Sequence, residues 1–497
     1  MDCGDRYRCS RGIAVWKIAA LLAICDICAY ANWREKMKVN RNICYVFGIY
    51  FVLFAALAVW IIKFAAFDAQ SIIANPYNPR VNLADSRINR GKIFAYSGEA
   101  LAEEAESEYR ARNYPHAFAF AHPLGFSGYN SQGVESLYSM ELLTVEREFS
   151  QRIKNASESA PIYGNDIVLT LDYALQSKAY ELLEGKAGAV VVIEPSTGRI
   201  LASAASPSFN PNRVDTEWEQ LLADTENNPL LNRAAQGLYP PGSVFKIVTL
   251  AAAKRYLPDF ESFTCTCEGS EVFDGKTLRC YNETAHGEVD YKSAFIKSCN
   301  IYFAQLGQMV GAENLKKTAE ELLFNTDLPY PLEYVNSSFA ADTSSGIAEM
   351  AETSIGQGKT LTTPLHMALL AASLANDGYL MQPYIVDSVV TPFGKTAKKN
   401  LPKMSQRLFS TEECEMFTEI MKGVVTEGTA SRLPEQLNMA GKTGSAETAS
   451  GDDHGWFVGF APADSPEIAV AVLVENCGGS AQVLPLVEEL AGVWSER

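Results

Sequence analysis

The sequence has no excess of positive charge. Its 497 residues include 42 Lys and Arg against 59 Asp and Glu, which gives a net charge of −17. A protein that binds nucleic acid needs a positive face for the phosphate groups, so this balance argues against that class of partner. Acidic surfaces mostly serve solubility, and the charge therefore identifies no substrate.

The chain also has no internal repeats and no low-complexity tract. Hydrophobic residues make up 47% of it, which is enough for sizeable cores. A chain of this length is too long for one ordinary domain, and we expect two or three.

The 11 cysteines lack the spacing of a disulfide scaffold. Cys265, Cys267, Cys280 and His286 form a loose cluster without a C-x-x-C pair. We interpret it as one disulfide or a set of reduced thiols, with a zinc site as the alternative, and we predict no metal centre.

One apolar segment predicts a membrane anchor. Residues 43–62 are 20 residues without a charge, and a helix rising ~1.5 Å per residue then crosses a ~30 Å hydrocarbon layer. Four basic residues precede it and predict a cytoplasmic N-terminus with the rest outside: Arg34, Lys36, Lys38 and Arg41. A cleaved signal peptide is the alternative, but the run is longer than a ~7–15 residue signal core.

An earlier apolar stretch, residues 13–30, is interrupted by Lys17 and Asp26. A charge near a helix centre costs ~2.5–3.5 kcal/mol on insertion, so we do not expect this stretch to span. A short basic segment that begins at Met37 leads directly into the anchor. We hypothesise that translation begins there and that residues 1–36 are not part of the native protein.

The domain organisation follows from these segments. Residues 1–42 are expected to be cytoplasmic, 43–64 to be the anchor, 67–165 a small N-terminal pedestal or dimerisation-like module, and 166–497 the catalytic domain. Within the module, residues 75–80 are expected to be extended, 90–102 a strand–turn–strand and 103–112 a helix. In the catalytic domain we expect hairpins at 189–205 and 455–475 and helices at 243–256, 364–376 and 483–496. These elements predict an α+β fold with an antiparallel sheet.

Ser243 and Lys246 form the only S-x-x-K sequence in the chain. Residues i and i+3 share a helix face, so the hydroxyl and the amine are expected to meet. A serine is a poor nucleophile unless a base takes its proton, and a lysine of lowered pKa can be that base. The motif alone also fits an ordinary helix start.

Two further motifs follow it. Ser298-Cys-Asn300 could relay a proton and orient an amide, and the run Lys442-Thr-Gly-Ser445, on a predicted strand, offers a cation, a hydroxyl and a close backbone approach at Gly444. Each alone also fits a surface segment. In this order they match the three-part signature of class A β-lactamases and penicillin-binding proteins, with S-C-N in place of S-D-N.

More of the chain, roughly residues 75–497, resembles a class B penicillin-binding protein of the short subgroup with a small N-terminal module. The resemblance rests on the three motifs and on several blocks: residues 90–102, 169–172, 232–246, 355–358 with Pro364, 428–430 and 454–459. It implies a serine β-lactamase/transpeptidase-like fold and a D,D-transpeptidase that β-lactams inhibit. The middle residue of S-x-N varies in the family, so we interpret Cys299 as a small buried packing residue.

The resemblance implies roles for seven residues and includes an eighth, Gly444, in the substrate-binding set. Ser243 attacks the penultimate D-Ala carbonyl of a peptidoglycan stem peptide, Lys246 is the acylation base, and Ser298 passes the proton to the leaving amine. Asn300 orients the substrate. Lys442 and Thr443 are expected to bind the terminal carboxylate, and the backbone N–H groups of Ser243 and Ser445, beside Gly444, to form the oxyanion hole. No metal or organic cofactor is implied.

Other functions remain open at this point. A D,D-carboxypeptidase or a β-lactamase-like hydrolase shares the fold and the first motif. A non-catalytic division or elongation scaffold is the alternative from another class. The resemblance implies a single-pass protein of the bacterial cytoplasmic membrane, acting in cell-wall synthesis for shape or division, with a glycosyltransferase and division or elongation proteins as partners.

Overall fold

The computed structural model describes residues 41–64, 88–105, 112–128, 130–144, 163–448 and 451–496. The chain divides into two units, 1–73 and 74–497. The basic residues at 34–38, the hypothesised start at Met37, the extended stretch at 75–80 and the middle of the helix predicted at 103–112 lie outside the described residues.

The first unit contains helix α2, Arg41–Lys63. Its stretch Tyr45–Lys63 has a mean hydropathy of 2.4, and it is the one helix in the described part of the chain that is long and apolar enough to cross a membrane. Its apolar side chains are exposed, as expected of a helix whose partner is lipid.

A five-stranded antiparallel sheet forms the centre of the second unit, in the order β15-β16-β17-β5-β6. The predicted hairpins supply four of its strands, β5 (Gly188–Ile193) with β6 (Ile200–Ser206), and β16 (His454–Ala461) with β17 (Ile468–Val474). The edge strand β15, Ala440–Ala446, carries the K-T-G motif. Nearly all residues of these strands are buried, because helices cover both faces.

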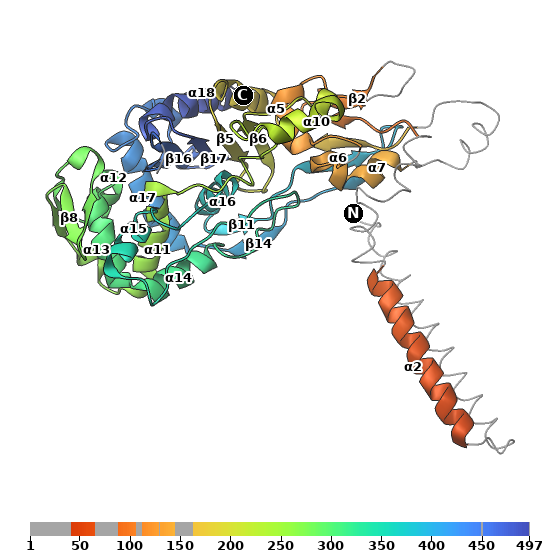
Figure 1. Cartoon of the computed structure of the whole chain (residues 1–497), viewed down its shortest axis with the longest axis horizontal. Coiled ribbons are helices and arrows are strands. Elements are labelled where there is room, and N and C mark those ends of the chain that lie inside the picture. The colour runs from red at the N-terminus through yellow and green to blue at the C-terminus, as the bar shows by residue number, and fades with distance from the viewer. Residues whose placement is uncertain are drawn as a thin grey trace, which may run out of the picture. The chain divides into compact units, whose positions relative to one another are not determined.

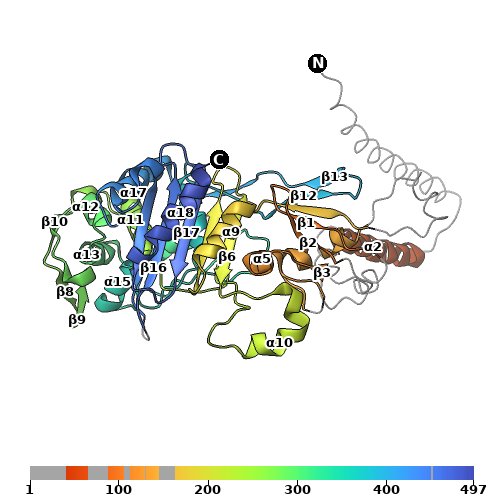
Figure 2. The ribbon, with the colours of Figure 1, turned by 90° about the horizontal axis from the view of Figure 1, so that it is seen from above.

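Helices α9 (Tyr173–Leu182) and α18 (Leu484–Ser495) lie together over one face of this sheet (Figure 2). Helix α16, Pro364–Leu374, packs on the other face against β5, β16 and β17, and all of its residues are buried. This arrangement confirms the predicted α+β class with helices on both faces of an antiparallel sheet.

A helical region adjoins the edge strand β15, and its helices α11, α13 and α14 are labelled at the left of Figure 1. Helix α17 and the 3-10 turn η3 contact β15 directly. The region contains η3 (Gly242–Phe245), α11 (Lys246–Tyr256), α12 (Tyr291–Ile296), α13 (Asn300–Val310), α14 (Ala312–Glu321), α15 (Ile347–Ser354) and α17 (Thr411–Thr426). Beside it are two small ribbons, β7 (Cys265–Cys267) with β10 (Gly287–Val289), and β8 (Ser270–Phe273) with β9 (Lys276–Arg279).

A second sheet has the order β13-β12-β4-β1-β2-β3, and it combines strands from the predicted N-terminal module with strands from residues predicted to belong to the catalytic domain. Its strands are β1 (Ile93–Phe94), β2 (Ala100–Glu104), β3 (Arg112–Asn113), β4 (Asp166–Leu169), β12 (Val386–Val390) and β13 (Thr396–Lys399). Strand β4 starts at the predicted domain boundary and pairs in parallel with β1. The helix expected at 103–112 is wrong at both ends, because Glu103–Glu104 pair with Arg112–Asn113 as strands.

The remaining elements connect these layers. They include α5 (Ala117–Leu124), which contacts β6 and α9, α6 (Gly133–Leu137), α7 (Ser139–Leu143), which contacts β4, α10 (Val214–Ala223), and the ribbon of β11 (Tyr379–Met381) with β14 (Met404–Arg407).

A buried cluster of charged side chains lies within the predicted N-terminal module. The Glu135 carboxylate is fully buried and accepts hydrogen bonds from Arg90 Nε and Arg112 Nε, each at 2.7 Å. Burial alone would raise the pKa of Glu135, but the two guanidinium groups outweigh it and hold the pKa below its ordinary value.

Glu135→Gln is therefore expected to lower the free energy of unfolding by ~3–5 kcal/mol, because it removes the buried negative charge that both guanidinium groups contact. Denaturant unfolding of the purified chain measures the change. Glu181→Gln is the matched control, since Glu181 is 66% exposed in its pair with Lys178, and such pairs contribute ~0–1 kcal/mol. Equal losses in the two variants would contradict a stabilising role for the cluster.

Candidate active site

The S-x-x-K motif lies on a tight helical turn. Ser243 is in the 3-10 turn η3, and Lys246 begins α11. In a 3-10 turn the side chains at i and i+3 eclipse each other, so the two groups project over the same face. Ser243 is half-buried at a cleft, and Lys246 is fully buried behind it. The turn therefore places the two side chains on one face, and direct contact between the hydroxyl and the amine stays a prediction.

The Lys246 amine contacts the second motif. Its Nζ donates to the Ser298 carbonyl oxygen at 2.7 Å, to Ser298 Oγ at 3.2 Å and to Asn300 Oδ1 at 2.7 Å. Burial lowers the pKa of Lys246 to about 8 and outweighs the opposing effect of the Cys299 and Cys280 thiols. An amine with a pKa near neutrality can exist without its proton, as a general base must.

Ser298 has a strained backbone. Its φ is +59°, a conformation that costs a non-glycine residue about 1–3 kcal/mol and recurs at functional sites. The turn places Ser298 between two lysines, since Lys442 Nζ donates to Ser298 Oγ at 2.9 Å. Lys442 is also fully buried, and burial first and Lys246 second lower its pKa well below the ordinary value.

The K-T-G strand lies against the nucleophile turn. Gly242 has a φ of +54°, and a methyl group on it would lie 2.5 Å from the Ser445 carbonyl oxygen. A methyl group on Gly444 would lie 3.1 Å from the Pro241 carbonyl oxygen. Both glycines are needed where two backbones approach this closely. The contact brings the backbone of Ser243 beside that of Ser445, where an oxyanion hole is expected.

Hydrogen bonds from the segment before Ser243 fix its position. Gly242 N–H donates to the Gly356 carbonyl at 2.9 Å, and Trp456 Nε1 donates to the Pro240 carbonyl at 3.0 Å. Tyr239 Oη and Arg233 Nε donate to Glu475 Oε1 at 2.8 and 2.7 Å. The turn is thus bonded to three separate parts of the fold.

The predicted residues meet at one cleft of about 870 Å³. Ser243, Ser298, Asn300, Thr443 and Ser445 line it. Lys246 and Lys442 lie buried behind Ser298, and Gly444 packs against the nucleophile turn. All eight residues are brought together, and their chemical roles remain predictions.

Residues 188–491 match the family described as the penicillin binding protein transpeptidase domain. The peptidoglycan D,D-transpeptidase PbpA of Mycolicibacterium smegmatis is 33% identical over 440 residues, which is 83% of this chain and 89% of that protein. The chain belongs to the class B penicillin-binding proteins.

Other relatives agree with this assignment. The peptidoglycan D,D-transpeptidase MrdA of Acinetobacter baumannii is 32% identical, over 82% of this chain and 69% of that protein. Among solved structures, penicillin-binding protein A of M. tuberculosis, as a ceftriaxone acyl-enzyme complex, has a TM-score of 0.75 at 30% identity, covering 82% of this chain and 99% of that one.

The sequence assigned no role to Thr429, a further polar residue of this penicillin-binding protein's cleft. Its Oγ1 lies 2.5 Å from Thr443 Oγ1, so it helps to orient the hydroxyl predicted to bind the substrate carboxylate. Residues 276–284 also line the cleft. In the sequence, only the resemblance block at 428–430 indicated Thr429, and no motif indicated residues 276–284.

The cysteine cluster differs from its prediction. All six cysteines after the anchor are free, which agrees with the reduced thiols that the sequence offered as the alternative to one disulfide. Cys265 is not a member of the cluster, whereas Cys299 is. Cys265 and Cys267 lie on the same face of β7, but Cys265 is opposite Val289 whereas Cys267 is opposite Gly287, next to His286. Cys299 belongs to the cluster because the N-terminus of α13 lies beside Cys280.

Gly242→Ala is expected to slow labelling by a fluorescent penicillin about tenfold or more. The added methyl group pushes the turn away from Ser445, and strain that raises the acylation barrier by ~1.4 kcal/mol already lowers the rate tenfold. Gly185→Ala is the matched control. Gly185 has a φ of +71° but no atom within 4 Å of an added methyl group, so it reports backbone strain alone. Unchanged labelling in Gly242→Ala would contradict the close approach.

Proposed function

We propose that this class B penicillin-binding protein cross-links peptidoglycan stem peptides through an acyl-enzyme on Ser243. The observation that carries the proposal is the buried Lys246 amine, one 3-10 turn from a serine at the cleft and hydrogen-bonded to Ser298 and Asn300. Relatives of similar length are peptidoglycan D,D-transpeptidases.

In the first half-reaction, Ser243 Oγ attacks the carbonyl carbon of the penultimate D-Ala, and its proton passes to the neutral Lys246 amine. The N–H groups of Ser243 and Ser445 stabilise the oxyanion. Removing one such donor from a well-studied protease costs ~2.7–4 kcal/mol. The peptide C–N bond then breaks, and Ser298 passes a proton to the leaving D-Ala amine.

In the second half-reaction, an amine of a neighbouring stem peptide attacks the Ser243 ester and gives up a proton, and the serine hydroxyl is restored. Lys442, with Thr443 oriented by Thr429, binds the terminal carboxylate of the donor or of a β-lactam. Asn300 Nδ2 donates to the Arg279 carbonyl at 2.7 Å, and its Oδ1 accepts from Lys246. This residue therefore orients the base as well as the substrate.

We also propose that α2 anchors the protein in the bacterial cytoplasmic membrane, with the N-terminus inside and the catalytic domain outside, as the basic residues before it favour. Glycan polymerisation then requires a separate glycosyltransferase, because about 100 residues between anchor and transpeptidase domain are too few for a second enzyme. Division or elongation proteins are the further partners of this proposal.

Intact-mass analysis of the detergent-purified chain with benzylpenicillin tests the nucleophile. A persistent adduct of one drug mass is expected on the wild type and on Ser208→Ala, a matched serine outside the cleft, and none on folded Ser243→Ala. An adduct that survives Ser243→Ala would contradict the assignment of the nucleophile.

A donor peptide ending in D-Ala-D-Ala, supplied with an amine acceptor, separates the alternative functions. Peptide-bond formation with the acceptor is expected. Release of hydrolysed donor alone would indicate a D,D-carboxypeptidase, rapid hydrolysis of the penicillin adduct a β-lactamase-like enzyme, and no reaction in either assay a scaffold.

A further inference from the structure

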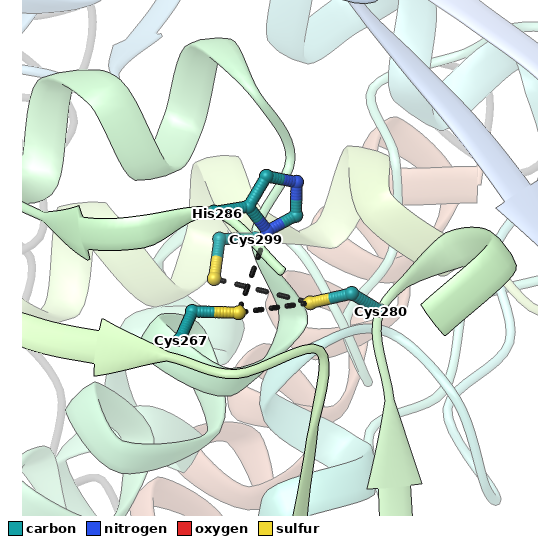
Figure 3. A group of neighbouring side chains, drawn as sticks. All are labelled: Cys267, Cys280, His286 and Cys299. Atoms are coloured by element: carbon teal, nitrogen blue, oxygen red, sulfur yellow. Dashed lines mark hydrogen bonds between the residues drawn. The ribbon is translucent and has the colours of Figure 1, made fainter. Parts of the chain in front are cut away.

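Four side chains beside the active site converge on one point (Figure 3). They are Cys267, Cys280, His286 and Cys299, and their Sγ and ring nitrogen atoms all lie within 4.8 Å of one another. The three cysteines are at most 2% exposed, and His286 is half-buried. Among the residues that the structure describes, this is the only grouping of three or more such side chains close enough to share an ion.

The four residues come from separate segments. Cys267 ends β7, Cys280 follows β9, His286 precedes β10, and Cys299 is the N-cap residue of α13. The pairing of β7 with β10 brings Gly287 opposite Cys267 and so places His286 beside it. The cluster therefore joins both small ribbons to the helix that carries the S-x-N motif.

Three of the six distances between ligand atoms fit a tetrahedral zinc ion directly, and all six are within 4.8 Å. With Zn–S bonds of ~2.3 Å and Zn–N bonds of ~2.05 Å, tetrahedral angles separate two sulfur ligands by about 3.8 Å and a sulfur from a nitrogen by about 3.6 Å. The Sγ atoms of Cys267 and Cys280 lie 3.6 Å apart, and those of Cys280 and Cys299 3.9 Å apart. Cys267 Sγ lies 3.5 Å from His286 Nδ1.

Backbone N–H groups donate to two of the three sulfur atoms. Asn300 N–H donates to Cys280 Sγ at 3.3 Å, and Tyr302 N–H donates to Cys299 Sγ at 3.5 Å. Both donors belong to the first turn of α13, where backbone N–H groups have no partner within the helix. Backbone N–H groups that donate to ligand sulfurs are typical of the outer shell of a metal–thiolate site.

We propose that Cys267, Cys280, His286 through Nδ1, and Cys299 bind one zinc ion. The three thiols lose their protons to solvent on binding, and His286 binds in its neutral form. Soft thiolate ligands with one imidazole select zinc over hard cations such as magnesium or calcium. Four protein ligands leave no open position, so the ion is structural and does not bind substrate.

The zinc ion acts on the active site through the backbone. Cys299 is the residue between Ser298 and Asn300, which both contact Lys246. Cys280 follows Arg279, whose carbonyl accepts from Asn300 Nδ2. The ion thus fixes the strained Ser298 turn and the wall of the cleft at 276–284 relative to the base. The four zinc ligands are therefore positioning residues and not catalytic ones.

Metal analysis of the full-length chain, purified in detergent with a reductant and without chelators, tests the site. One zinc ion per chain is expected in the wild type. Cys280→Ala is expected to weaken zinc binding about tenfold or more and to slow penicillin labelling. Cys280→Asp is expected to restore both in part, because a carboxylate can also bind zinc.

Cys265→Ala is the matched control, since Cys265 lies two residues from Cys267 on the same strand, is nearly buried, and is not a ligand. It is expected to keep its zinc and its labelling rate. Should Cys280→Ala fail to fold, chelation of the wild type followed by zinc addition replaces it, with loss and recovery of labelling expected.

The outcomes are independent of the proposed function, because zinc content is measured without substrate. A chain that is labelled by penicillin and yet holds no zinc would overturn the site. So would iron in place of zinc, or equal zinc loss in Cys265→Ala and Cys280→Ala.

Discussion

The active site depends on a lysine amine enclosed in the protein interior. Lys246 has no exposed surface, and three oxygen atoms of Ser298 and Asn300 surround its Nζ. A second buried amine, Lys442, reaches the same Ser298 hydroxyl. Two ammonium ions so close together in a low-dielectric interior are unfavourable, and both burial and their mutual repulsion favour the neutral forms. A buried amine of this kind can take a proton from a serine near neutral pH.

The fold supplies this environment by bringing together three segments that are distant in sequence. The η3–α11 turn carries Ser243 and Lys246, the start of α13 carries Ser298 and Asn300, and β15 carries Lys442. Glycines at 242 and 444 permit the first and third to touch. Ser298 has a positive φ at the junction, and strain of this kind persists only where the surroundings fix it. The proposed zinc site, of which Cys299 is a ligand, is part of those surroundings.

Much of the fold and of the site could be predicted from the sequence, because the signals are local. Alternating or continuous apolar runs bounded by turns located β5, β6, β16 and β17, and proline and glycine marked the starts of η3 and α16. The i, i+3 spacing of Ser243 and Lys246 sufficed to pair them. The order of three motifs, with the resemblance blocks, sufficed to associate Ser298, Asn300 and Lys442 with them.

The rest depends on contacts between distant segments. Glu103 and Arg112 lie in a charged stretch that suits a helix, yet pairing between β2 and β3 prevails. The four residues of the cysteine cluster come from separate segments without C-x-x-C spacing, so the sequence included Cys265 and left out Cys299. Likewise, no local pattern places Thr429 against Thr443, because the contact joins the segment after α17 to β15.

The pH dependence of acylation tests the role of Lys246 most directly. The second-order rate constant for penicillin labelling of the full chain would be measured from about pH 6 to about pH 10, around the range in which a lowered lysine pKa falls. Because only the neutral amine accepts the serine proton, the rate should rise about tenfold per pH unit at the acid end and level off near the pKa of about 8. A rate that does not change with pH, or that levels off only near the ordinary lysine pKa of about 10.4, would contradict the account.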